Sequence, residues 1–159
     1  MSTQRKTLFM ATTAIKPAKT AAEITQLLAA GGAEQINSTY SAGRITGLTF
    51  SIQVKGMPMV FALPVRSEAL FAYMKKYGSL VTGGKIPTTE QAERIAWRQL
   101  LRWVEIQLVL IQTGMAPVAE VFLPYIVDAS GRSFYAAIEG SGFRGLSAGS
   151  SFARIGDGE

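Results

Sequence analysis

The chain contains neither cysteine nor histidine. Disulfide bonds and Ser-His-Asp or Cys-His catalysis are therefore excluded, and zinc loses its two usual ligands. The commonest general base near neutral pH is missing as well. Acidic residues are few, 11 among 159 residues, and their scatter suggests no pair of carboxylates sharing one site. We therefore expect a protein that is not an enzyme and that uses no metal and no cofactor.

A long apolar run is also missing. The most apolar stretch, residues 103–111, is interrupted by Glu105 and Gln107 and is far shorter than the ~20 residues that a membrane-spanning helix needs. The apolar segment 8–15 near the N-terminus is short and carries two threonines, unlike the core of a secretory signal. We expect a soluble, cytoplasmic protein.

About half of the residues, 48%, are hydrophobic, which is enough for a packed core in a single domain of this length. The formal net charge is +5 and the isoelectric point is about 9.7. A basic balance favours anionic partners such as nucleic acid. Many small proteins carry such a charge for solubility alone, so composition leaves both readings open.

Two segments have the period-two pattern of β-strands. Residues 48–55 and 59–65 alternate apolar with polar side chains, and Gly56 between them indicates a hairpin. Pro58 and Pro64 place the second strand at an edge of the sheet or end it early. A long helix is predicted over 88–113, because Thr88 and Gln91 have capping-box spacing and Gly114 follows.

Shorter elements complete the prediction. We expect a strand over 7–12 that Pro17 ends, a helix from an N-cap at Thr20 to Gly31, a helix from an N-cap at Ser67 to Gly78, a loop over 79–87, a short helix between Pro117 and Pro124, a strand over 125–127, a turn at Gly131 and a helical turn over 134–138. The fold class is therefore α+β, with a small antiparallel sheet built on the hairpin 45–65 and packed by the long helix and two or three shorter ones. Residues 1–139 form the single domain, frayed over 1–6, and the Gly/Ser-rich segment 140–159 is expected to be a disordered tail.

The main candidate site is a stripe of arginines on the long helix. Arg94, Arg98 and Arg102 recur every four residues, which spaces them about 6 Å apart along the axis. That spacing suits successive phosphates of a strand, and guanidinium groups bind phosphate well. Further charge would come from Arg44, Lys55, Lys75, Lys76 and Lys85. The alternative is that the stripe is the wet face of a buried helix, where Glu90 and Glu105 can pair with Arg94 and Arg102.

Two other features carry weaker expectations. The segment 103–111 is apolar nearly all round the helix, which predicts a homo-oligomer contact, with a well-wrapped monomer as the alternative. The glycines at 78 and 83 have the spacing of a phosphate-binding loop, but Gly84 stands where that motif needs lysine, and Ile86 follows Lys85. A nucleotide hydrolase is therefore not expected.

Several segments resemble small proteins encoded by bacteriophages and prophages, a group for which no activity is established. The resemblance extends from Thr20 to Ile138 and is carried by residues 90–98 (EQAERIAWR), 103–107 (WVEIQ), 113–115 (TGM) and 121–125 (VFLPY). It implies a phage-like setting in a bacterial host, where small basic proteins often serve DNA replication, recombination or host takeover.

Two functions are compatible with these observations. The first is a non-enzymatic accessory protein of a phage or mobile element that binds single-stranded DNA or RNA through its backbone. The second is an inhibitor or sponge that binds a host protein or a small anionic ligand. The first predicts binding that weakens steeply with salt, and the second predicts a defined pocket or an apolar patch.

Overall fold

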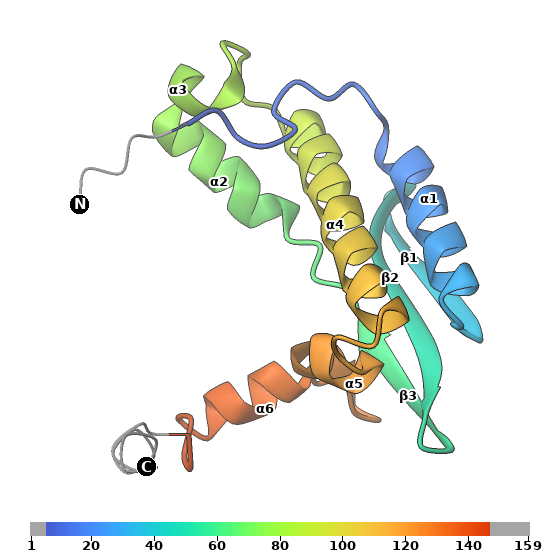
Figure 1. Cartoon of the computed structure of the whole chain (residues 1–159). Coiled ribbons are helices and arrows are strands. Elements are labelled where there is room, and N and C mark those ends of the chain that lie inside the picture. The colour runs from blue at the N-terminus through green and yellow to red at the C-terminus, as the bar shows by residue number, and fades with distance from the viewer. Residues whose placement is uncertain (1–5, 147–159) are drawn as a thin grey trace, which may run out of the picture.

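The computed structural model describes residues 6–146, and its fold is α+β, as predicted (Figure 1). The elements in chain order are α1 (Pro17–Ala30), β1 (Gln35–Ser41), β2 (Arg44–Val54), β3 (Met57–Ala62), α2 (Ser67–Tyr77), α3 (Ser79–Thr82), α4 (Thr89–Gln112), α5 (Val118–Val121), the 3-10 helix η1 (Leu123–Tyr125), β4 (Ile126–Val127) and α6 (Phe134–Gly140). The strands form one antiparallel sheet in the order β1-β2-β3-β4. Helix α4 packs against α1 on one side and α2 on the other.

The predicted hairpin is confirmed as β2 and β3. Its two-residue turn, Lys55 and Gly56, has positive φ at both positions (50° and 79°), which is the type I′ geometry that matches the twist of paired strands. β3 ends at Ala62, before Pro64, as the prolines suggested. Pro58 is tolerated because β4 pairs with β3 only at Val60 and Phe61.

Strand β1 was not predicted. Six of its seven residues are exposed, so its sequence shows no apolar alternation. It pairs with β2 through a bulge in which Thr46 is the extra residue, since Thr39 lies opposite Gly47 and Tyr40 opposite Ile45.

Two predictions for the N-terminal part of the chain were wrong. Residues 7–12 form no strand, because residues 9–12 make a turn and residues 7–8 have no regular secondary structure. The Gln91 side chain ties this part of the chain to α4, because its Nε2 donates to the backbone oxygens of Ala11 and Thr13. Helix α1 begins at Pro17 rather than after a cap at Thr20. Proline suits a first helical position because its φ is preset and its missing N–H has no partner there.

The long helix is confirmed over 24 residues. The Thr88 hydroxyl accepts a hydrogen bond from the Gln91 backbone N–H (3.1 Å), as the capping spacing predicted. α2 ends at Gly78 as expected, but Ser67 is its first residue and not its cap. The loop expected over 79–87 begins with the short helix α3.

The core lies between the sheet and the helix pair α1–α4. Phe50 of β2, Phe61 of β3 and Phe122 after α5 form an aromatic cluster with ring centroids 5.1 to 5.8 Å apart. A second cluster of Met74, Ala92 and Ile95 joins α2 to α4. The two clusters make α4 the central element of the fold.

The C-terminal elements agree with the predictions for 117–138. α5 follows Pro117, β4 lies within the expected strand, Gly131 has φ of +80°, and α6 covers the expected helical turn. In the segment expected to be disordered, residues 141–145 form turns and residues 147–159 lie outside the described range. Residues 1–5, most of the segment expected to be frayed, also lie outside it. Within residues 6–146, no helix has both the length and the hydropathy needed to cross a bilayer.

Candidate functional site

The predicted arginine stripe is not a single exposed surface. Arg98 is 6% exposed and lies between α4 and α1, where its Nη1 is 2.7 Å from Oε2 of Glu23 and 3.4 Å from Oγ1 of Thr20. Its Nε is buried and has no hydrogen-bond partner among residues 6–146. The expectation that all three guanidinium groups face water together is therefore wrong. Helical spacing shows which residues share a face but not that α1 covers that face.

The other two arginines of the stripe reach the surface but are already engaged. Arg102 pairs with Glu105 at 2.9 Å, as the alternative reading expected, and the hydrogen bond and charge of Glu105 raise the pKa of Arg102. Arg94 is half-buried, and its Nη1 donates to Oε1 of Gln91 (3.3 Å) rather than to Glu90. Neither residue offers a free guanidinium in line with its neighbour.

The five peripheral cations do not all gather around this stripe. Arg44 is the first residue of β2 and Lys55 follows its last residue, which places them about 36 Å apart at roughly 3.3 Å per residue. The Nζ atoms of Lys75 and Lys76 lie over the rings of Phe71 and Tyr77, at 4.6 and 5.3 Å from the centroids. Lys85 is exposed in the loop before α4. These positions span the two ends of β2, the last turn of α2 and the loop before α4.

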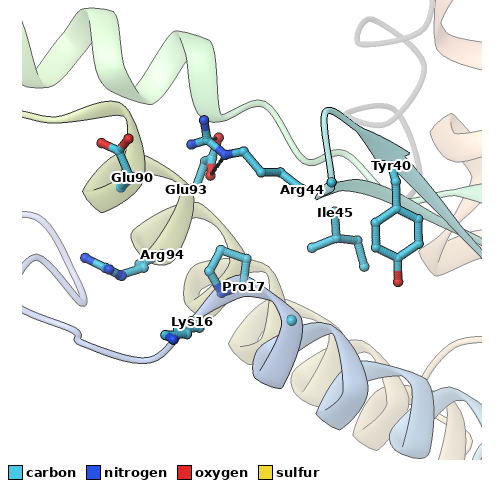
Figure 2. Close-up of a pocket in the computed structure, with 10 residues that line it drawn as sticks. Lys16, Pro17, Tyr40, Arg44, Ile45, Glu90, Glu93 and Arg94 are labelled. Atoms are coloured by element: carbon cyan, nitrogen blue, oxygen red, sulfur yellow. Dashed lines mark hydrogen bonds and ion pairs between the residues drawn. The ribbon is translucent and has the colours of Figure 1, made fainter.

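A pocket of about 280 Å³ does bring two of the predicted residues together (Figure 2). It lies where the start of α1, the β1–β2 turn and the start of α4 meet. Its charged and aromatic lining consists of Lys16, Tyr40, Arg44, Glu90, Glu93 and Arg94. We call it the charged pocket.

The charged pocket contains charges of both signs. Arg44 reaches across to Glu93, with Nη2 2.6 Å from Oε1, and this hydrogen bond and the carboxylate charge raise the pKa of Arg44. Lys16 and Arg94 form no ion pair within the described residues. Since Glu90 also lines the pocket, its net formal charge is only +1, from three cations and two carboxylates.

A second concave surface has a different chemistry. Two adjoining pockets of about 320 and 380 Å³ share Pro64, Arg66 and Tyr125 in their linings. Together they run from Trp103 on α4 past Arg66 and Tyr125 to Arg132 and Tyr135 at the start of α6. Among the described residues, no carboxylate lines either pocket. We call this surface the Arg–aromatic groove.

The aromatic rings of the groove are fixed by the core. Trp103 is half-buried and meets the rings of Phe122 and Tyr125 edge to face, with centroids 5.6 and 5.4 Å away. Phe122, one of the core aromatic residues, and Tyr125, the last residue of η1, both contact Trp103. The core therefore fixes the Trp103 and Tyr125 side of the groove. Tyr135 is 42% exposed on α6, which projects from the body of the molecule (Figure 1).

The two arginines of the groove lie in connecting segments, Arg66 directly before α2 and Arg132 at the end of a turn before α6. Arg66 precedes α2, is exposed, and its side chain makes no ion pair or hydrogen bond with any residue of 6–146. Arg132 follows a turn in which Oδ1 of Asp128 accepts hydrogen bonds from Ser130 Oγ, the Ser130 N–H and the Arg132 N–H. The Ser130 hydroxyl first, and then the Arg132 N–H, lower the pKa of Asp128. The turn therefore holds Arg132 beside α6, where its Nη2 donates to the Ala136 oxygen (3.2 Å).

None of the eight cations predicted from the sequence lines this groove. Arg66 and Arg132 lie in connecting segments 66 residues apart, where no periodicity marks them. Trp103 has both a packed edge, against Phe122, and a place in the lining of the groove. The apolar segment around it is covered in part, because Leu108 and Ile111 pack on the core while Ile106 and Val109 stay 61% and 52% exposed.

The described part of the chain contains no cluster of three or more acidic side chains that could hold a metal ion. Searches for relatives leave the function open: no family model matches the chain, and no significant match was found among curated proteins or solved structures.

Proposed function

We propose that the protein is a non-enzymatic accessory protein that binds single-stranded nucleic acid in the Arg–aromatic groove. The observation that carries the proposal is the lining of the groove, in which Arg66 and Arg132 alternate with Trp103, Tyr125 and Tyr135 and no carboxylate intervenes. Proteins that bind single strands combine a positive groove along the backbone with rings on which bases stack. The phage-like setting in a bacterial cytoplasm is part of the same proposal.

The shape of the groove favours a single strand over a duplex. Base faces are buried by stacking in a duplex, so aromatic side chains contribute most to single strands, whose bases can be splayed apart. The rings of Trp103 and Tyr125 are partly buried and packed against each other and the core, so they lose little side-chain freedom on binding. Arginine adds planar, multidentate hydrogen bonding to phosphate.

The arginines can be tested by salt dependence. We expect the variant Arg66→Gln/Arg132→Gln to bind a short oligothymidylate at least tenfold more weakly than the wild type. Two phosphate contacts fewer should reduce the slope of log K against log salt by about 1.4. The measurement is fluorescence anisotropy at several salt concentrations. A matched control, Lys55→Gln/Lys85→Gln, removes the same total charge at two exposed sites outside the groove.

The aromatic contribution is tested separately. Tyr135→Leu keeps an apolar side chain at an exposed position, and we expect it to lower affinity with an unchanged salt slope, because stacking on an aromatic ring contributes about 1–3 kcal/mol per base. If the arginine variant and its charge-matched control bind the oligonucleotide equally, the groove is not the binding surface.

The charged pocket supports a second candidate function, the capture of a small anionic ligand. Lys16 and Arg94 reach the pocket without an ion-pair partner in the described chain, and the pocket is concave rather than an open face. A phosphate monoester in the pocket would form ion pairs with both Lys16 and Arg94, while Arg44 keeps its salt bridge to Glu93. We expect little salt dependence for a ligand held this way compared with a polynucleotide.

Calorimetry with a nucleoside monophosphate distinguishes the two candidates. Lys16→Gln/Arg94→Gln should remove mononucleotide binding and leave oligonucleotide binding intact if the pocket is a ligand site. Absence of heat with the wild-type protein would rule out this second candidate and leave the groove proposal untouched.

A further inference from the structure

The two edges of the sheet are built differently. β4 at one edge has two residues, and an isolated bridge between Val127 and Ser133 continues beside it. β1 at the other edge has seven residues, and in the described chain only β2 pairs with it. The β4 edge is thus short and partly occupied, whereas the β1 edge presents an unpaired row of backbone N–H and C=O groups.

Strand β1 lacks the features by which proteins usually prevent edge-to-edge pairing. Such features are charged side chains, prolines, bulges in the edge strand itself, or a very short strand. β1 (QINSTYS) has no charged residue and no proline. The bulge in this hairpin adds its extra residue to β2, so the spacing of β1 remains regular.

The side chains of β1 are complementary to a second copy of themselves. Ile36, Ser38 and Tyr40 point to the helix side, since they lie opposite Phe50, Leu48 and Ile45. Asn37 and Thr39 point to the other face. If two β1 strands pair antiparallel about a two-fold axis at Ser38, each Ile36 lies opposite Tyr40 of the second copy, and each Asn37 lies opposite Thr39.

We propose that β1 pairs with β1 of a second copy of this chain, forming a continuous eight-stranded sheet with all helices on one face. Aromatic and β-branched side chains make favourable cross-strand pairs, as do polar side chains that hydrogen bond. The contact would cover the ring of Tyr40, which is 64% exposed. Two copies of a chain with a net charge of +5 repel each other, and this repulsion is smallest where the contacting strand carries no charged residue, as in β1.

The competing dimer contact is the exposed apolar face of α4. Ile106 and Val109 belong to α4 and not to β1, so each contact can be disrupted by a substitution in a different element. The β1 contact is favoured because it provides hydrogen-bond partners for outward-facing backbone groups along seven residues. The α4 face offers only two large exposed apolar side chains among the described residues, Ile106 and Val109.

The test uses charge at the two-fold axis. Ser38 is exposed, so Ser38→Lys and Ser38→Glu are tolerated in a single copy, but each variant places two like charges against each other in the dimer. By light scattering after size exclusion, we expect the wild type to be a dimer and each variant alone to be a monomer. An equimolar mixture of the two variants should restore a dimer containing one of each. Ile106→Glu should leave the wild-type dimer unchanged.

A second measurement uses the absence of cysteine from the chain. Ser38→Cys introduces a single thiol, and we expect oxidation to cross-link it to the second copy, whereas Gln53→Cys on β2 should stay uncross-linked. A monomeric wild type, dimeric Ser38→Lys and Ser38→Glu variants, or a dimer lost only in Ile106→Glu would overturn the proposal. Oligonucleotide binding is measured independently, so this result does not depend on the proposed function.

Discussion

The α1–α4 interface and the Arg–aromatic groove use the same residue type in opposite ways. At the interface, Arg98 is buried and held by Glu23, with its Nε left without a partner. In the groove, Arg66 and Arg132 are exposed and no carboxylate lines the surface. Both regions add positive charge to the same total, but only in the second do the guanidinium groups lie at the surface without a salt bridge to another described residue.

The difference shows why a basic composition does not locate a binding site. A guanidinium that faces a carboxylate across a buried interface contributes to folding specificity and has little remaining interaction for phosphate. An exposed guanidinium next to packed aromatic rings keeps its hydrogen-bonding capacity and gains a preorganised apolar surface. The carboxylates around each arginine therefore matter more than the spacing of the arginines along a helix.

The largest expected effect comes from removing the counter-charge of the buried arginine. Glu23→Gln leaves Arg98 without its anionic partner in a site that is 93% shielded at the side chain, and we expect a loss of about 3 kcal/mol in the free energy of unfolding. Urea denaturation followed by tryptophan fluorescence measures this loss. Oligonucleotide affinity under native conditions should not change, because Glu23 does not line the groove.

The control replaces the arginine itself. Arg98→Met removes the buried charge and the unpartnered Nε together, while Glu23 remains 35% exposed and hydrated. We expect a loss below about 1.5 kcal/mol, smaller than that of Glu23→Gln. Equal losses in the two variants would mean that packing, and not the uncompensated charge, determines stability at this interface.

Features that depend on neighbouring residues could be predicted from the sequence. The Thr88 cap, the Lys55-Gly56 turn and the end of α2 at Gly78 each follow from local backbone chemistry, and all are present. Strand β1 could not be found this way, because it is specified by pairing with β2 and not by its own apolar pattern. The turn over 9–12 likewise depends on the Gln91 side chain, 78 and 80 residues away from the groups it contacts.

The candidate site was less predictable than the fold. Helical periodicity in the sequence is enough to place Arg94, Arg98 and Arg102 on one side of α4. Whether Arg98 is buried depends instead on where α1 packs, which that periodicity does not indicate. The groove joins the β3–α2 connection, α4, η1 and the turn before α6, and no local signal links these segments. Single residues in connecting segments become a site only after the chain has folded.

The turn that holds Arg132 should have an intermediate effect. Asp128→Ala removes the acceptor of three hydrogen bonds, and we expect about threefold weaker oligonucleotide binding with nearly unchanged unfolding. The lowered pKa of Asp128 means that its stabilisation is complete above the ordinary value near 3.9 and is lost as pH falls through the lower folded-state pKa. Anisotropy titrations should therefore show the same loss of oligonucleotide affinity on Asp128→Ala at pH 5 as at pH 7. Asp128→Asn, which keeps one oxygen acceptor, should lie between Ala and the wild type.

The smallest effect is expected at Arg102, the exposed member of the original stripe. Its pair with Glu105 is a surface i,i+3 contact with both side chains about 40% exposed, so Arg102→Gln should leave the free energy of unfolding almost unchanged. Its effect on oligonucleotide affinity should be no larger than that of Lys55→Gln, which also removes a single positive charge. The comparison between the two regions would fail if Arg102→Gln weakened binding as strongly as the paired change at Arg66 and Arg132. In that case phosphate would compete successfully with Glu105, and the exposed part of α4 would be the contact surface despite its carboxylate.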